Sequence, residues 1–279
     1  MNDIKGVPKD TIICKVDGQL TDLSSNLNKN CELQFMDAKS KDGHSVLLHS
    51  TAHLMAQAVK RLFPKTKVTI GPFLENRFYY DFDVNSPFTE DDLLEIENEM
   101  MKISEENLEI SHQEKSRNEA LAFFEKIDES YKVEIINDLD KDETLKVYSQ
   151  GEFTDLCRGP HVHSTGQIKH FKILSSSAAY WRGDEKNQTL QRVYGTSFQN
   201  SKDLKKYLQM LEEQKKRDHR KIGKELDLFF FDDEVGPGLP LWTPSGTVLI
   251  DELEALAKEK ETANGYLRVR TPHLTKGDL

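Results

Sequence analysis

The clearest hydrophobic pattern of the chain lies in residues 43–64, GHSVLLHSTAHLMAQAVKRLFP. Apolar residues recur there with helical spacing, at Leu48, Ala52, Met55, Val59 and Leu62. Pro64 predicts the end of this helix. His49 and His53 are four residues apart, so both side chains project from one helical face beside the apolar stripe.

Three other stretches favour β-strands. In the first 40 residues the runs TIICKV and CELQFM are accompanied by an Asp17-Gly18 turn, which is typical of a hairpin. Residues 67–84 alternate and are rich in aromatic and β-branched side chains, which predicts two strands around a Gly-Pro turn. Residues 171–198 also predict strands.

Helical patterns fill much of the remaining chain. Residues 89–107 predict a helix with Thr89 as N-cap and acidic residues in its first turn, and residues 116–127 predict a second. Leucines at helical spacing predict a connecting helix from Asp203 to about Lys221, continuing into the basic stretch that follows. Residues 244–274 predict a helix followed by a strand.

This order of elements predicts an α+β fold. The first 40 residues are a small piece made of short strands, and the helix from Asp203 has the pattern of a connector between domains. The helix and strand that follow it are too few to form a domain core.

Composition narrows the class of protein. Charged residues make up 31% of the 279 residues and hydrophobic ones 37%, and no apolar run approaches the roughly 20 residues of a membrane span. The N-terminus has no apolar signal segment, and the three cysteines are scattered. We therefore expect a cytoplasmic protein with no membrane association and no disulfide framework.

Charge is distributed unevenly along the chain. The formal net charge is −10, yet residues 158–224 carry 15 Lys and Arg against 6 Asp and Glu. A local basic surface of this kind can follow a phosphate backbone while the rest of the protein stays acidic. The distribution leaves nucleic-acid binding open.

Two pairs of side chains carry the candidate chemistry. His49 and His53 form H-x-x-x-H on a helix, and Cys157 and His161 form C-x-x-x-H across a Gly-Pro turn, with Asp155 beside the cysteine. The four residues suit a tetrahedral zinc site, or a hydrolytic site in which imidazoles move protons and a carboxylate orients water. Ser50 after His49 excludes the metalloprotease motif H-E-x-x-H, and the chain has no Walker loop and no G-x-G-x-x-G.

Five segments together resemble bacterial-type threonyl-tRNA synthetases, in the same order and at similar separations. They are HSTAHLMAQAVKRLFP, IGPFLENRFYYDFD, TDLCRGPHV, AYWRGDEKNQTLQRVYGTSF and RDHRKIGKELDLF. The resemblance implies a partial TGS domain of the β-grasp type at residues 1–41 and an α+β editing domain at 42–200, with an antiparallel sheet and a long helix. It further implies a linker helix at 201–226 and the start of the class II catalytic domain at 227–279. GYLRVRTPHL resembles motif 1, with Pro272 at the proline position.

The resemblance also implies an activity. The whole enzyme would charge tRNA(Thr) with threonine, using ATP with Mg²⁺ and a catalytic Zn²⁺, and would act as a homodimer. Nothing here corresponds to the ATP-binding motifs or to the Cys/His/His zinc set, so we expect a piece of a longer enzyme. The part present would hydrolyse mischarged Ser-tRNA(Thr).

Residue roles follow from the motif match. The resemblance assigns catalytic roles to His49, His53, Lys132, Asp155, Cys157 and His161, and substrate-binding roles to Tyr80, Tyr180 and Arg182. It favours a metal-free site, although zinc on His49, His53, Cys157 and His161 is an alternative. Two other functions stay open: a free-standing aminoacyl-tRNA deacylase, and a non-catalytic tRNA-binding module.

Overall fold

The structure is a computed structural model that describes residues 4, 6–140 and 144–271. The chain divides into two compact units, residues 1–207 and 208–279. The described residues form helices and several antiparallel sheets, which confirms the α+β class. None of the helices in these ranges is both long and apolar enough to cross a membrane.

The long helix α1 (Lys41–Leu62) lies at the centre of the first unit. Ser40 caps it by accepting a hydrogen bond from the backbone N–H of Gly43. The apolar stripe predicted from the sequence is buried in the main core, with Leu48, Ala52, Met55 and Val59 at most 1% exposed. The predicted helix is therefore confirmed.

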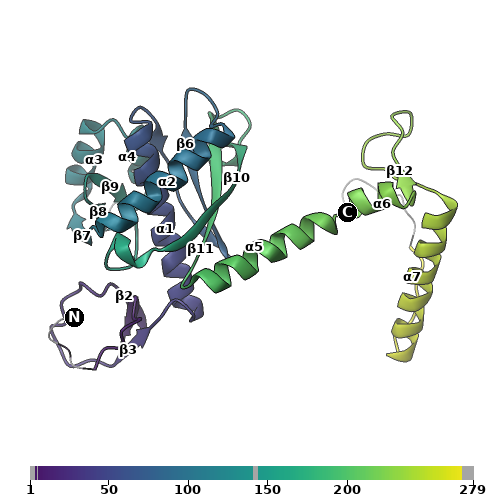
Figure 1. The fold of residues 1–279 in the computed structure, drawn as a ribbon, viewed down its shortest axis with the longest axis horizontal. Coiled ribbons are helices and arrows are strands. Elements are labelled where there is room, and N and C mark those ends of the chain that lie inside the picture. Colours follow the sequence, from purple (N-terminus) through teal and green to yellow (C-terminus); the bar gives the residue numbers. More distant parts are fainter. Residues whose placement is uncertain (1–3, 5, 141–143, 272–279) are drawn as a thin grey trace. The chain divides into compact units, whose positions relative to one another are not determined.

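The central sheet has the strand order β10-β11-β6-β4 and is antiparallel throughout. Its long strands are β6 (Arg77–Asp83), β10 (His170–Tyr180) and β11 (Thr189–Phe198), while β4 (Lys67–Val68) and β5 (Phe73–Leu74) are short pieces paired with β6. The alternating residues Phe78, Tyr80 and Phe82 of β6 are fully buried. Helix α1 and helix α2 (Glu90–Glu106), which starts at a Thr89 capping box, pack on this sheet (Figure 1).

A second sheet carries the cysteine turn. It consists of β7 (Ile110–Lys115), β8 (Leu145–Gln150) and β9 (Phe153–Leu156). Helices α3 (Arg117–Lys126) and α4 (Ser130–Asp138) build a separate apolar cluster against β8. The sequence pattern of residues 130–138, which form α4, did not predict a helix. Single-turn 3₁₀ helices η1 (Thr165–Gln167) and η2 (Trp181–Gly183) flank β10.

The two strands and the turn predicted in the first 40 residues are confirmed, and an additional short strand, β2, follows the turn. β1 (Ile13–Val16) pairs with β2 (Gln19–Thr21) across the Asp17-Gly18 turn and with β3 (Leu33–Met36) on its other side. Asp17 and Gly18 both have positive φ, at 50° and 84°, as the turn requires.

The predicted connecting helix is divided in two. Two residues separate helix α5 (Ser201–Lys216) from helix α6 (His219–Glu225). The break occurs because Asp218 caps a new helix by accepting a hydrogen bond from the backbone N–H of Arg220. In the second unit β12 (Phe229–Phe230) pairs with β13 (Leu241–Trp242), and helix α7 (Pro244–Ala263) follows.

The strand predicted after that last helix is absent from residues 264–271, which have no regular structure beyond a turn. Burial explains why: Leu267 and Val269 are 93% and 82% exposed, so the described part of the chain offers this stretch neither a pairing strand nor a core. The rest of the prediction, including Pro272, lies outside the described residues.

Candidate active site

Helix α1 supplies one side of the site. His49 and His53 project from the same face, with ring centroids 5.2 Å apart, as their spacing predicted. Ser50, on the same helix, is fully buried and points its hydroxyl at the turn that follows β9.

The Gly-Pro turn supplies the other side. The Gly159–Pro160 peptide bond is cis, and Gly159 has a φ of +65°, a conformation that favours glycine. A Cβ at Gly159 would stand 1.9 Å from the hydroxyl oxygen of Tyr148, so only glycine fits. The backbone N–H of Gly159 donates to Cys157 Sγ at 3.2 Å, which fixes the thiol within the turn.

The two sides meet as the sequence predicted. Cys157 Sγ lies 3.3 Å from His49 Nε2 and 3.3 Å from His161 Nε2. One ligand-type atom from each of His49, His53, Cys157 and His161 lies within 4.8 Å of the others. Segments about a hundred residues apart in sequence therefore form one compact cluster.

A chain of hydrogen bonds links the cluster to the backbone. The Val162 N–H donates to Ser50 Oγ at 3.0 Å, and Ser50 Oγ lies 3.1 Å from His161 Nδ1. In one proton arrangement Ser50 donates to His161 Nδ1, His161 Nε2–H donates to Cys157, and the thiol donates to His49 Nε2. Every member of the cluster is then uncharged.

Burial keeps these groups neutral. It lowers the pKa of His49 to about 4 and the pKa values of His53 and His161 well below their ordinary value. It raises the pKa of the Cys157 thiol to about 12. At neutral pH the imidazoles are thus free bases, and the cysteine is a thiol rather than a nucleophilic thiolate.

A buried ion pair borders the cluster. Lys132 of α4 forms a salt bridge with Asp155 of β9, and both side chains are 2% exposed. Tyr80 of β6 donates to Asp155 Oδ2 at 2.6 Å and accepts from Lys132 Nζ at 3.1 Å. Burial and the Asp155 charge raise the pKa of Tyr80 well above its ordinary value. His53 Nε2 lies 3.7 Å from Asp155 Oδ2, so this charged group and the imidazoles adjoin.

Tyr180 and Arg182 lie elsewhere, where β10 turns into β11. Tyr180 is 47% exposed, and the Arg182 guanidinium forms salt bridges with Glu134 and Asp138 of α4. No contact between this pair and the cluster is found among the described residues, and their substrate-binding role stays a prediction. Helix α4 nevertheless connects them with Lys132, which it also carries.

Part of the basic charge of residues 158–224 is neutralised locally. Arg192 forms two hydrogen bonds with the carboxylate of Asp81, at 2.7 and 2.8 Å, and Lys172 pairs with Glu97 at 2.6 Å. Acidic residues from other elements thus offset several of these cations. The charge count by itself overstated the basic surface.

Three supporting residues escaped the sequence analysis: Ser50, Tyr148 and Asp22. The ring centroids of Tyr148 and His161 are 4.5 Å apart. Asp22 accepts hydrogen bonds from the Tyr148 hydroxyl and from the backbone N–H of His161. A polar Ser50 within an apolar helical stripe was a usable signal. Asp22 and Tyr148 carried none, because only the tertiary fold brings them to the turn.

The sequence matches a known family within this region. Residues 145–194 match the family described as threonyl and alanyl tRNA synthetase second additional domain. This range contains Asp155, Cys157 and His161 but not the histidines of α1. The class of the site is thus that of an accessory domain of aminoacyl-tRNA synthetases.

Whole-chain relatives make the similarity more specific. The chain is 51% identical to the threonine–tRNA ligase of Pelobacter propionicus over 98% of its length, and that match covers 43% of the relative. It is 50% identical to the enzyme of Symbiobacterium thermophilum, over 97% of this chain and 42% of the relative. It is 49% identical to the enzyme of Geobacter sp. strain M21, over 98% of this chain and 43% of the relative. The chain is thus similar to threonine–tRNA ligases along nearly its whole length, and it spans about two fifths of the length of these curated relatives.

Proposed function

We propose that this chain is the part of a threonine–tRNA ligase that removes serine from mischarged tRNA(Thr) by hydrolysis. The whole protein would join threonine to tRNA(Thr) with ATP, as a homodimer in the cytoplasm. The observation that carries the proposal is the buried cluster of His49, His53, Cys157 and His161 beside the Lys132–Asp155 ion pair. Similarity to a threonine–tRNA ligase over 98% of the chain supports it.

The domain assignment belongs to the same proposal. Residues 1–41 correspond to part of a TGS domain, 42–200 to the editing domain, 201–226 to the linker and 227–279 to the start of the class II catalytic domain. The family match at 145–194 lies inside the editing assignment. The three-stranded N-terminal sheet and the separate unit from residue 208 agree with the outer two assignments.

Serine and threonine explain why a second site is useful. They differ by one methyl group, and a pocket discriminates against such a difference by only about 1–3 kcal/mol. A second site that accepts serine and excludes the methyl group multiplies the selectivity of the first. Tyr80 and His53, 0% and 4% exposed, both contact Asp155 and would exclude water from the bound amino acid in that sieving role.

The chemistry is ester hydrolysis. A water oxygen bonds to the ester carbonyl carbon, the bond to the ribose oxygen breaks, and free serine and tRNA(Thr) result. His49, a neutral base, takes the water proton, or a ribose hydroxyl relays that proton to the leaving ribose oxygen; in either case the leaving oxygen ends protonated. Asp155, His53, Cys157 and His161 bind the amino acid or orient the water.

Lys132 stabilises the negative charge that develops on the carbonyl oxygen. Its ammonium group donates a hydrogen bond to the Tyr80 hydroxyl and forms a salt bridge with Asp155. We infer that one of its other N–H groups is the donor to the substrate. Because Tyr80 and Asp155 hold the ammonium in place, the donor needs little reorganisation during the reaction.

The residues present also fit a metal ion. Three imidazoles and a thiol are a donor set that binds zinc, and their ligand atoms already lie within 4.8 Å of one another. Bound zinc would polarise a substrate oxygen or activate water, and the Cys157 thiol would have to lose its proton. We favour the metal-free site, in which Cys157 contacts the substrate instead.

Hydrolysis of Ser-tRNA(Thr) by variants of this chain tests the proposal. His49→Ala and Cys157→Ala should each lower kcat/KM at least 100-fold, whereas the exposed His163, replaced by alanine, is a matched control that should change little. If all three variants hydrolyse Ser-tRNA(Thr) at the original rate, this cluster is not the catalytic site. If the original chain and all three variants bind tRNA but hydrolyse nothing, the non-catalytic tRNA-binding module is supported. Activity lost in chelator and restored by zinc, with one metal per chain, would contradict the metal-free site.

A further inference from the structure

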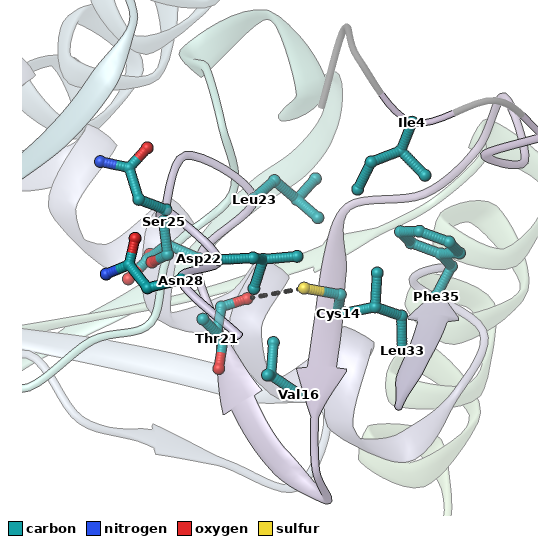
Figure 2. Close-up of a pocket in the computed structure, with 12 residues that line it drawn as sticks. Ile4, Cys14, Val16, Thr21, Asp22, Leu23, Ser25, Asn28, Leu33 and Phe35 are labelled. Carbon is teal, nitrogen blue, oxygen red and sulfur yellow. Dashed lines mark hydrogen bonds between the residues drawn. The ribbon is translucent and has the colours of Figure 1, made fainter. Parts of the chain in front are cut away.

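Asp22 joins the N-terminal sheet to the catalytic turn. It follows β2 and is 7% exposed, and it is 139 residues away from His161 in the sequence. Figure 2 shows it beside Thr21 and Leu23, on the border of an open cavity of about 360 Å³ that the N-terminal strands and the loop after β2 line. Its carboxylate is directed out of that sheet, toward β8 and the turn.

Both oxygens of this carboxylate accept hydrogen bonds from residues at the catalytic turn. Oδ1 accepts the backbone N–H of His161 at 2.8 Å, and Oδ2 accepts the hydroxyl of Tyr148 at 2.7 Å. These hydrogen bonds fix the end of the Cys157–His161 turn and the tyrosine behind it. The His112 imidazole lies 3.6 Å from Oδ2 and adds a third polar neighbour.

Tyr148, held by Asp22, in turn restrains the His161 imidazole and the Gly159 backbone. Its ring lies 4.5 Å from the ring of His161, and its hydroxyl occupies the space where a side chain on Gly159 would otherwise stand. Through Tyr148, Asp22 therefore limits the movement of both the imidazole and the turn. The direct bond to the His161 backbone limits the same turn from another direction.

Burying a carboxylate is costly unless hydrogen bonds compensate for the lost water. An apolar residue of similar size would suit the edge of a small sheet without that cost, but it could not hold a backbone N–H and a tyrosine hydroxyl together. The geometry thus indicates that the carboxylate serves the turn rather than the sheet on which it resides.

We propose that Asp22 is a positioning residue for the deacylation reaction, which makes the N-terminal segment a working part of the editing site. The inference rests on the proposed deacylase function. Asp22 lies behind the cluster and acts through His161 and Tyr148. Its loss should lower kcat rather than raise KM, because displacement of a catalytic group by about 1 Å costs on the order of 100-fold in rate.

The test uses the whole chain and compares Asp22→Ala, Asp22→Asn and Tyr148→Phe in Ser-tRNA(Thr) hydrolysis. We expect kcat to fall 10- to 100-fold for Asp22→Ala with KM within threefold of its original value. Asp22→Asn keeps an acceptor for the His161 N–H and should recover part of the loss. Tyr148→Phe removes only the hydroxyl and keeps the variant set informative if Asp22→Ala does not fold.

Asp17→Ala is the matched control. Asp17 belongs to the same sheet and accepts the Glu32 backbone N–H at 2.9 Å, but it lies in the turn away from the site. Equal losses for Asp17→Ala and Asp22→Ala would overturn the inference, because general damage to the sheet would then explain both.

A second measurement does not depend on activity. Alkylation of Cys157, followed by mass spectrometry of its peptide, should speed up in Asp22→Ala because the turn is released, and stay unchanged in Asp17→Ala. If the original chain shows no hydrolysis, the proposed function fails, and faster alkylation still supports the positioning role. Normal kcat and normal alkylation in Asp22→Ala would overturn that role.

Discussion

At the scale of single residues, the buried Lys132–Asp155 ion pair is the central feature of this site. A pair with both side chains 2% exposed gains little stability over apolar residues, but removal of one partner leaves an uncompensated buried charge. Tyr80 contacts both members of the pair, so the three groups behave as a unit. The arrangement is more readily explained by catalysis than by stability.

Replacement of Lys132 by methionine should therefore have two separable effects. We expect a loss of about 3–5 kcal/mol in the free energy of unfolding, measured with urea, because Asp155 stays buried without its partner. The double variant Lys132→Met/Asp155→Asn should regain most of this stability but not the hydrolysis of Ser-tRNA(Thr). Recovery of full hydrolysis in the double variant would show that Lys132 is not needed for the chemistry.

Several of these residues could be predicted from the sequence, and others could not. His49 and His53 follow from helical spacing, and Cys157 and His161 follow from a short turn motif, because both are local patterns. Lys132 and Tyr80 were assigned only by resemblance to a family, since an isolated lysine or aromatic residue carries no signal. Asp22 depends on a contact across 139 residues, which no local pattern records.

At the scale of elements, Arg61 near the end of α1 ties three segments together. Its guanidinium contacts Glu99 and Glu106 of α2 and Glu152 in the turn between β8 and β9. Glu152 also accepts a hydrogen bond from Gln57. Arg61 thereby fixes α1 against the β8–β9 hairpin, and β9 leads into the Cys157 turn that the α1 histidines contact.

This network predicts an acid-sensitive contribution to stability. Hydrogen bonds from Arg61 lower the pKa of Glu152 to about 2, so its contribution is fully present above about pH 4.5 and is lost as pH falls through about 2. Because the Glu152 side chain is 56% exposed, we expect Glu152→Gln to cost only about 1 kcal/mol. Urea unfolding at pH 7 and pH 3 measures this, and the difference between the two proteins should shrink at pH 3. A constant difference would contradict the assignment.

The elements themselves were largely predictable, with informative exceptions. Long periodic segments such as α1 and α2 have strong signals of their own. The break at Asp218 was missed because the apolar spacing and the basic run continue past a capping residue. The strand expected near Leu267 and Val269 had a suitable residue pattern, but strand formation also needs a partner.

At the scale of the whole molecule, the chain combines an acidic total charge with a basic segment and a neutral, buried site. Ion pairs such as Arg192–Asp81 use part of the basic charge within the fold. Recognition of a tRNA would then depend on the cations that stay exposed, such as those of α5 and α6. Under the proposed function, these exposed cations would hold the tRNA while the buried site acts on the end of that substrate.

The most direct test of this account compares the rates at which the chain hydrolyses Ser-tRNA(Thr) and Thr-tRNA(Thr). A pocket that excludes one methyl group should favour the seryl ester by about 10- to 200-fold, and His53→Ala should abolish the faster reaction. Equal hydrolysis of both esters, or hydrolysis of neither, would contradict the central claim that this site removes serine from tRNA(Thr).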